Sequence, residues 1–536
     1  MRGGQQIKNR GRGPRPLGAA RTVVGLGLAA AAAAAAWAPA SLAAGEDVQR
    51  VIVVFKPQVG AAARTALPLQ GGQVRLSLPE DNAVAVELPA GAVEALRRHP
   101  SVAQVHEDVR RYPMGLADPS KPPYRRGQLV PYGIPMVQAD QLPVGDAQTG
   151  NRKLCIIDSG YDRSHEDLAT NKVDGEYDSG TGWWHTDETH HGTHVAGTIA
   201  AINQAGVGVV GVNPGRRLQL HIVKVFGEGG DWTYSSSLTK AARKCQAAGA
   251  NIISMSLGGA TPTPFERDAF ARLAADGILS IAAAGNAGTS ATSYPAGYPS
   301  VMSVAAVDIQ RKRASFSQFN PDVEIAAPGV AVLSTVPMGQ GREATLSVAA
   351  TAYAPQPFDG TPVASASGPL ADFGEGTAVD PAMAGKVCLI RRGTISFAQK
   401  VVNCQQSGGV AAVVYNNEAG GLAGTLGGVT TTIASVGVSD TEGQALRAQL
   451  GQGATVQVSA TDYAYFDGTS MATPHVSGVA ALVWSYFPQC SAAQIRTTLQ
   501  KSALDLGPAG RDKWYGFGLV QAKAAHDRLA SLGCAN

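Results

Sequence analysis

The sequence predicts an α/β fold: a mostly parallel sheet flanked by helices, preceded by an N-terminal α+β unit and interrupted by an inserted β-rich domain. Three observations support this prediction. After Lys153, short apolar runs alternate with helical patterns, which is typical of strands buried on both faces of a parallel sheet. A compact stretch of mixed strand and helix patterns precedes them. The composition then changes between about Met338 and Asp462.

Residues 1–44 have the layout of a secretory signal peptide. They carry basic residues and no acidic ones, and an Ala-rich apolar run from Thr22 to Ala38 is followed by small residues. We therefore expect a secreted, extracellular protein with no membrane contact after this leader is removed. The whole chain has a formal net charge of +3, and the leader alone contributes six basic residues. The residues after the leader are therefore slightly acidic overall, which gives no electrostatic reason to expect nucleic acid binding.

Residues 45–112 are predicted to form the small α+β unit. Its β-rich runs are VIVVFKPQVG and NAVAVELP, and the amphipathic stretch AGAVEALRR is predicted to be a helix. Arg97 and Arg98 lie at the C-terminal end of this helix, where positive charge suits the helix dipole. The Pro-, Gly- and Arg-rich residues 113–126 are typical of a linker.

The main α/β unit is assigned to residues 127–337 and 463–536. Five runs are predicted to be strands of its sheet: KLCIIDSG, LHIVKVFG, ANIISMSLGG, ILSIAAAGN and VMSVAAV. In residues 338–462 Gly, Ala and Val become more frequent and histidine is absent. These residues are predicted to form a separate inserted domain, in which GKVCLIRRG and GGVAAVVYNN are strands and SFAQKVVNCQQSG is the helix between them.

Four polar residues are expected to meet at the carboxyl edge of the predicted sheet. Asp158 and Asn286 each follow a strand, while His191 and Ser470 each open a helix. A serine hydroxyl becomes a nucleophile when an imidazole takes its proton and a carboxylate orients that imidazole. Asn286 and a main-chain N–H at a helix start could bind the oxyanion. Taken singly, each residue also has a structural reading, and Ser470 would suit a helix N-cap.

Five stretches carry a resemblance to the subtilase family of serine peptidases: IIDSGYDRSHEDL, HHGTHVAGTIAAI, SLGG, AAAGN and DGTSMATPHVSGVAAL. The resemblance covers about residues 127–337 and 463–525. It implies a subtilisin-like serine endopeptidase with Asp158, His191 and Ser470 as the catalytic triad and Asn286 as the oxyanion residue. It also implies protein or peptide substrates and no cofactor for catalysis. We expect a monomer.

The resemblance extends to the other two units. Residues 45–112 are similar to the inhibitory propeptides of subtilases, so the chain is expected to be an autoprocessed preproprotein whose own propeptide inhibits it. Processing is expected between about Pro113 and Gly127. The inserted segment resembles a protease-associated (PA) domain, carried by GKVCLIRRGTISFAQKVVNCQQSGGVAAVV.

The family likeness also implies binding residues. Substrate peptides are expected to lie as an added strand along two edges, formed by Gly230, Asp231, Ser256, Leu257 and Gly258. A structural calcium ion is expected at the side chains of Gln128 and Asp167, because oxygen donors suit a hard cation.

Other interpretations remain in view. A catalytically silent secreted protein-binding module is the main alternative. A lipase-type hydrolase is disfavoured because Gly468-Thr469-Ser470-Met471-Ala472 lacks the second glycine of its nucleophile motif. A metal site in the His-rich tract that includes His185, His190 and His194 is disfavoured because no HExxH-type glutamate accompanies it.

Six cysteines in an exported chain predict disulfides. Cys388 and Cys404 lie close in sequence within the insertion, and Cys534 could tether the C-terminus to Cys490. The remaining pair would be Cys155 with Cys245. The alternative for this last pair is two buried thiols.

Overall fold

The computed structural model describes residues 48–57, 59–60, 72–113, 116–117, 128–142, 149–204, 206–227, 232–417, 422, 424–427 and 429–535. The predicted leader lies outside these residues, as do most of the predicted linker and the predicted edge residues Gly230 and Asp231. Among the helices of the described ranges, none combines the length with the apolar character that crossing a bilayer requires.

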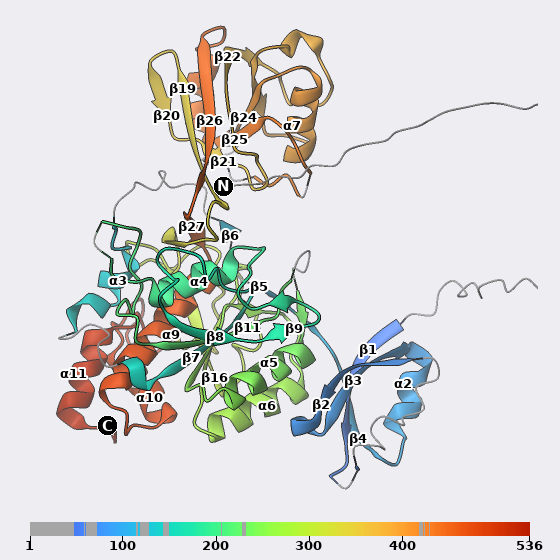
Figure 1. Cartoon of the computed structure of the whole chain (residues 1–536), viewed down its shortest axis with the longest axis vertical. Helices are drawn as coiled ribbons and strands as arrows, with labels where there is room; N and C mark the ends of the chain where they lie inside the picture. Colours follow the sequence, from blue (N-terminus) through green and yellow to red (C-terminus); the bar gives the residue numbers. More distant parts are fainter. Residues whose placement is uncertain are drawn as a thin grey trace, which may run out of the picture. The chain divides into compact units, whose positions relative to one another are not determined.

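The N-terminal unit is a four-stranded antiparallel sheet covered by one helix (Figure 1). In the order β2-β3-β1-β4, its strands are β1 (Val48–Phe55), β2 (Gln73–Leu78), β3 (Ala83–Pro89) and β4 (Val102–Glu107). The helix α2 (Ala90–Arg97) buries Val93 and Leu96 in a core that includes Val53 and Val86. The predicted helix and both predicted strands are present, and two further strands complete the sheet.

A seven-stranded parallel sheet forms the centre of the main unit, as predicted. In spatial order its strands are β17 (Ile325–Pro328), β16 (Val301–Val307), β15 (Leu279–Ala283), β13 (Ile252–Met255), β7 (Lys153–Asp158), β11 (Gln219–Lys224) and β8 (Lys172–Gly175). The five predicted runs supply five of these strands. Side chains alternate between two cores: Leu154 and Ile156 join one, while Cys155 and Ile157 join the other.

Helices cover both faces of this sheet. The core that contains Leu154 is packed by α4 (His191–Ala200), α9 (Thr469–Tyr486), α10 (Ala492–Ser502) and α11 (Ala522–Leu532). The other core is packed by α5 (Ser235–Ala247) and α6 (Pro264–Ala275).

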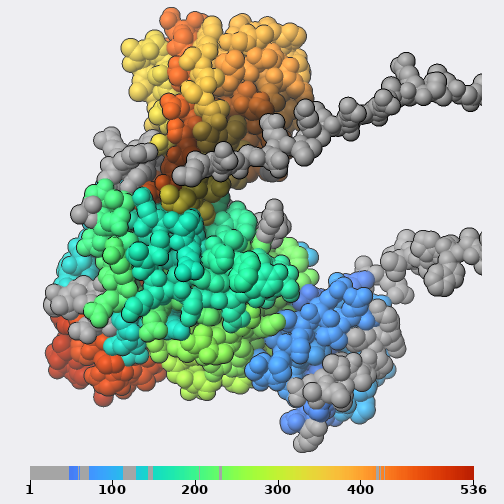
Figure 2. Space-filling model, in the orientation of Figure 1, coloured from blue at the N-terminus to red at the C-terminus, as the bar shows by residue number. Residues whose placement is uncertain are grey.

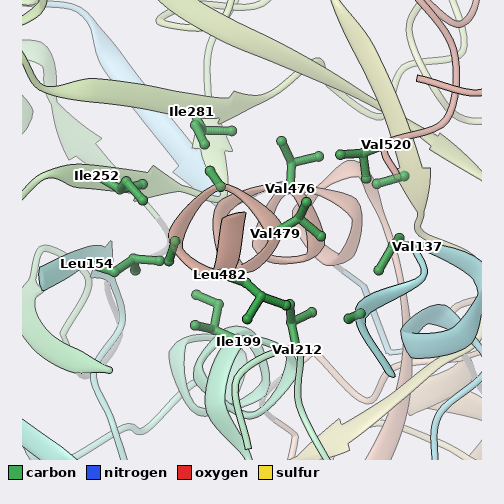
Figure 3. Packing of buried hydrophobic residues seen from close by; sticks show 14 of the residues in the cluster. Val137, Leu154, Ile199, Val212, Ile252, Ile281, Val476, Val479, Leu482 and Val520 are labelled. Carbon is green, nitrogen blue, oxygen red and sulfur yellow. The ribbon is translucent and has the colours of Figure 1, made fainter. Parts of the chain in front are cut away.

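Helix α9 lies at the centre of the main unit, and its residues from Thr469 to Ser485 are all buried. Figure 3 shows its side chains Val476, Val479 and Leu482 among residues of the sheet, of α4 and of the segments beside them. Because one helix is enclosed on all sides, its N-terminus is held rigidly.

The insertion contains an eight-stranded mixed sheet of its own, with helices α7 (Phe397–Gln406) and α8 (Asp440–Arg447). In spatial order its strands are β20 (Thr351–Tyr353), β19 (Gly341–Val348), β26 (Gly453–Thr461), β22 (Ala364–Asp372), β23 (Val387–Arg391), β24 (Ala411–Tyr415), β25 (Ala434–Val438) and β21 (Gln356–Pro357). The predicted strands and helix correspond to β23, α7 and β24. In Figure 2 the yellow of β19 and β22 adjoins the orange-red of β26, as their pairing requires.

The insertion leaves and rejoins the main unit at one place. β18 (Val332–Thr335) pairs antiparallel with β27 (Tyr463–Asp467), and just beyond them β19 pairs with β26, with Gly341 opposite Thr461. We call this double ribbon the stem. The described residues also include short elements: α3 (Gly133–Met136), β9 (Tyr177–Asp178), β10 (Gly182–Trp183), and the 3-10 turns Pro79–Asp81, Ala139–Gln141, Thr149–Asn151 and Pro381–Met383.

All three predicted disulfides are present. Cys155 on β7 is bonded to Cys245 on α5 with a Cα–Cα distance of 5.6 Å. This confirms the pair for which two buried thiols were the alternative. Cys388–Cys404 joins β23 to α7, and Cys490–Cys534 ties the C-terminus to the turn after α9. The described residues include no free cysteine.

Candidate active site

Asp158 and His191 form a buried hydrogen-bonded pair. Asp158 is the last residue of β7 and His191 is the first residue of α4, so a strand end and a helix start bring them together. Asp158 Oδ1 lies 2.7 Å from His191 Nδ1. This contact orients the ring and leaves Nε2 as the nitrogen that can exchange a proton. Nε2 is buried and has no hydrogen-bond partner among the described residues.

Asp158 also controls the pKa of His191. Burial lowers the pKa of the imidazole, but the charge of Asp158 and its hydrogen bond outweigh burial and raise the pKa above its ordinary value. The charge of Asp187 adds to this rise. The pair therefore stabilises the imidazolium that forms when a general base accepts a proton.

Asp187, which the sequence analysis did not single out, anchors the start of α4. Its Oδ2 accepts the main-chain N–H of Thr193 at 2.7 Å and the Thr193 hydroxyl at 2.6 Å, while Oδ1 accepts the Ser159 hydroxyl at 2.7 Å. Gly192 packs so closely that an added Cβ would lie 2.3 Å from the carbonyl oxygen of Gly160. An acidic residue just before a helix start was the only signal in the sequence that could have revealed Asp187.

Ser470 is the second residue of α9 and is fully buried. Its hydroxyl donates to the carbonyl oxygen of Ser256 at 2.9 Å, and the Ser256 hydroxyl donates to the carbonyl oxygen of Ser470 at 2.8 Å. That second bond is open to Ser256 because Pro474, four residues further on, has no N–H to donate to Ser470. α9 packs against α4. The structure thus joins Asp158 to His191, but the Ser470 hydroxyl points to Ser256 and makes no hydrogen bond to His191 in the described part of the chain.

Asn286 lies beside the start of α9, as the sequence predicted for a residue at this edge. Its Oδ1 accepts the main-chain N–H of Thr469 at 2.9 Å and the Thr469 hydroxyl at 2.8 Å. An amide whose oxygen is held in this way presents its NH₂ group as the donor. The side chain is therefore oriented next to Ser470 by the helix that carries Ser470.

Two of the other histidines in the His-rich tract pack against aromatic rings. His194 is fully buried, its Nε2 lies 3.0 Å from the carbonyl oxygen of Val332, and its ring stacks on Phe466 at a centroid distance of 4.3 Å. Burial lowers the pKa of His194 to about 3, so it stays neutral. His185 is exposed and stacks on Trp183. Within the described ranges, no group of three or more His, Cys, Asp or Glu residues is arranged to hold a metal ion.

One predicted substrate edge carries a segment of the chain itself. β5 (Arg110–Pro113) pairs antiparallel with β14 (Leu257–Gly258), with Tyr112 opposite Gly258. Ser256 directly precedes β14, so all three predicted residues of this edge lie together. The other predicted edge, Gly230 and Asp231, is outside the described residues, but β12 (Thr233–Tyr234) follows it and pairs with the opposite side of β5.

A second short strand lies near the start of α9. β6 (Leu116–Ala117) pairs antiparallel with β27, with Leu116 opposite Asp467, three residues before Ser470. β5 and β6 are therefore each paired with strands of the main unit.

Further contacts hold the N-terminal unit to the helices of the main unit. Asp108 lies at the start of α5, where its carboxylate accepts the N–H of Ser236 at 2.9 Å and the Ser236 hydroxyl at 2.5 Å. Arg50 donates to the same carboxylate at 2.8 Å. Asp81 Oδ1 accepts hydrogen bonds from Arg243 of α5 at 2.7 Å and from Arg272 of α6 at 2.6 Å. A carboxylate at a helix N-terminus and paired charges stabilise such an attachment.

The two residues predicted to bind calcium lie at one loop. Asp167 is fully buried; its Oδ2 accepts the N–H of Val209 at 2.8 Å, while Oδ1 is buried and has no hydrogen-bond partner in the described part of the chain. Burial raises the pKa of Asp167. Gln128 Nε2 donates to Asn203 Oδ1 at 3.1 Å, and the N–H of the next residue, Leu129, donates to the carbonyl oxygen of Gly208.

Comparison with known proteins agrees with this geometry. The model of the subtilase family matches residues 150–371 and 409–518, more than half of the chain, and the model of the PA domain matches residues 344–446. Subtilisin NAT of Bacillus subtilis subsp. natto is 36% identical over 299 residues, which cover 54% of this chain and 74% of that protein. Subtilisin DY of Bacillus licheniformis is 42% identical over 216 residues, or 39% of this chain and 76% of that protein.

A solved structure is also similar. The psychrophilic subtilisin-like protease Apa1 of the Antarctic psychrotroph Pseudoalteromonas sp. AS-11 is 46% identical, with a TM-score of 0.56. The match covers 76% of this chain and 99% of that one. With its parallel sheet, its buried Asp–His pair and the family match over most of the main unit, this chain belongs to the subtilase family and is a subtilisin-like serine endopeptidase that carries a PA domain.

Proposed function

We propose that this peptidase is secreted and hydrolyses peptide bonds through an acyl-enzyme formed on Ser470. His191 is the general base, Asp158 orients it, and Asn286 is an oxyanion donor. The observation that carries this proposal is the 2.7 Å contact between Asp158 and His191 at the carboxyl edge of the sheet, beside the start of α9. Secretion is inferred from the sequence of residues 1–44.

The steps follow from these positions. Rotation of the Ser470 side chain away from the Ser256 carbonyl turns its hydroxyl toward His191 Nε2. Oγ then attacks the peptide carbonyl carbon and its proton passes to Nε2. The amide of Asn286 and a main-chain N–H at the start of α9 bind the oxyanion. The C–N bond breaks as Nε2 gives its proton to the leaving nitrogen, and water releases the acyl group by the same route.

Labelling with a serine-directed fluorophosphonate, followed by peptide mapping, tests this proposal. We expect modification of Ser470 in the processed protein and none in the unprocessed protein, where the chain's own segment lies in the cleft. Processed protein that is folded but unlabelled at Ser470 would instead favour the catalytically silent binding module.

We also propose a domain organisation and a place of self-processing. Residues 1–44 are the leader, 45–112 the inhibitory propeptide, 113–126 the linker, 127–337 and 463–536 the peptidase, and 338–462 the PA domain. Support comes from β5, which lies between β12 and β14 as a substrate strand would. β6 pairs with β27 beyond this point. Within the expected range from Pro113 to Gly127, we therefore propose that the cleaved bond lies between residues 113 and 116. N-terminal sequencing of the mature enzyme should therefore begin at residue 114, 115 or 116.

A structural calcium ion is proposed at Gln128 and Asp167. The buried Oδ1 of Asp167 lacks a hydrogen-bond partner in the described region, and an unpaired buried carboxylate oxygen suits a hard cation. At a free ion concentration of 100 times the Kd, binding adds about 2.7 kcal/mol to the free energy of unfolding. A chelator should therefore lower the Tm of the wild type, and should lower it far less in Asp167→Asn. An unchanged Tm in chelator would rule the site out.

A further inference from the structure

Arg111, on β5, is one of the largest fully buried side chains of the described residues. It lies opposite Thr233 of β12, and the next residue, Tyr112, lies opposite Gly258 of β14. A guanidinium buried in this way is costly unless a charged partner receives it. The residues that surround Arg111 therefore form a pocket for a charged side chain.

The partner is Glu266, in the first turn of α6, which is also fully buried. Arg111 Nε donates to Glu266 Oε1 at 3.1 Å, and Nη2 donates to Oε2 at 2.5 Å, so the two planar groups meet through two parallel bonds. A lysine cannot make this double contact, because its ammonium is a single point of charge.

Tyr298 also holds Glu266 in place. Its hydroxyl lies 2.8 Å from Glu266 Oε2 and accepts the N–H of Thr263 at 2.9 Å. Burial raises the pKa of Tyr298, and the charge of Glu266 raises it further, so the phenol remains a donor. The carboxylate is thus fixed in position by the peptidase itself.

Gly259 lies close to β5, where a side chain would not fit. An added Cβ there would lie 2.5 Å from the carbonyl oxygen of Arg110 and 3.1 Å from Arg111 Nη1. The absence of a side chain lets the bound strand approach closely enough for Arg111 to reach Glu266.

We propose that Glu266, Tyr298 and Gly259 form a specificity subsite that selects arginine in peptide substrates. This inference rests on the proposed function, in which substrates occupy the place of β5. A peptide that pairs in the same register puts one side chain into this pocket, two residues before the residue opposite Leu257. An apolar side chain there leaves the Glu266 carboxylate buried without a cation, and an acidic one adds repulsion.

Matched quenched fluorescent peptides test the proposal on the mature enzyme. The parent peptide has the sequence of residues 107–120, and Arg111 is replaced by Lys, Leu or Glu. Relative to arginine, we expect kcat/KM to fall about 10-fold with lysine and about 100-fold with leucine, and further with glutamate. Equal cleavage of the arginine and leucine peptides would overturn the subsite and leave the proposed function intact. Failure to cleave any of these peptides or denatured casein would overturn both.

Variants of the pocket give a second test. Glu266→Leu alone would leave Arg111 of the unprocessed chain buried without its partner and could block folding, so the double variant Arg111→Leu/Glu266→Leu restores an apolar match. Once matured, this enzyme should cleave the leucine peptide at least as well as the arginine peptide. Asp268→Asn, on the exposed side of the same helix, is the control and should keep the preference for arginine. A double variant that still prefers arginine about 100-fold would contradict the assignment of Glu266.

Discussion

Two sets of polar contacts have opposite requirements under the proposed function. Around Ser470, the contacts of Asp158, Asp187 and Asn286 hold strand ends and helix starts in place, and they would have to persist through each turnover. Between the N-terminal unit and the helices of the main unit, the side chains of Asp108 and Arg111 are buried as well. Under the proposed function these second contacts must be lost before substrate enters.

The comparison shows that burial and hydrogen bonding alone do not make a contact permanent. The contacts around Ser470 are made within one folded unit around α9, so opening them would require the core to open. The contacts of the N-terminal unit join segments that a single cut in the chain would make into separate molecules. Their lifetime then depends on dissociation rather than on unfolding.

The largest expected effect is that of Ser470→Ala, which removes the proposed nucleophile. Peptide hydrolysis should fall by about 10⁶-fold, a magnitude measured on a subtilisin relative. The unprocessed chain should accumulate with β5 still attached. Mass spectrometry of the purified protein, together with hydrolysis of a quenched peptide, measures both effects. Normal maturation of this variant would show that another protease performs the cut.

Asp158→Asn should lower kcat by about 10⁴-fold, the loss known for this change in a serine protease triad. It also tests the pKa of His191. Catalysis needs the neutral imidazole, so wild-type kcat/KM should fall as the pH drops through the raised pKa of His191. Without the negative charge this pKa falls, and the acid limb moves to lower pH. Asp187→Asn should move the limb in the same direction by less. If the fall of kcat/KM at acid pH stays at the same pH in Asp158→Asn, a group other than His191 causes it.

Asn286→Ala should lower kcat about 10²- to 10³-fold, with little change in KM, because the oxyanion develops after the substrate is bound. The magnitude comes from the corresponding donor in a subtilisin. Circular dichroism should show a native fold. If kcat stays within a few-fold of the wild type, the oxyanion is bound by main-chain donors alone.

Asp108→Asn is expected to give the smallest effect and to act only on the contacts that must be released. The amide still accepts hydrogen bonds but loses its charge at the start of α5 and its pairing with Arg50. Inhibition by the cleaved segment should weaken about 10-fold, so the lag before full activity shortens while kcat of the mature enzyme is unchanged. Glu94→Gln, on the exposed side of α2, is the control and should leave the lag as it is. A lag equally long in Asp108→Asn would place the inhibitory contact elsewhere.

Much of the main unit could be predicted from the sequence because its signals are local. Each predicted strand is a short apolar run, and Asp158, His191 and Ser470 each stand at the boundary of such a run or of a helix. The disulfides were predictable because nearness in sequence or a position on neighbouring elements restricted the pairings.

What escaped prediction depends on contacts between distant parts of the chain. Glu266 follows a proline in the first turn of a helix, where an acidic residue is usually exposed, yet it is fully buried against Arg111. Asp108 follows a strand of the N-terminal unit, and its carboxylate binds the start of a helix of the main unit. The direction of the Ser470 hydroxyl depends on Ser256, far away in the sequence. No periodicity or spacing encodes such pairs.

The stem between the peptidase and the PA domain affects the entropy of chain closure. Because Gly341 and Thr461 face each other, the peptidase fold has to close a single loop at one point, whatever lies beyond it. The entropic cost of closing a flexible loop grows only with the logarithm of its length, by about 0.6 kcal/mol for each doubling. The inserted residues also bury cores of their own around β26 and α7, so their order is supported from within. A domain attached in this way therefore places little thermodynamic burden on the peptidase that carries it.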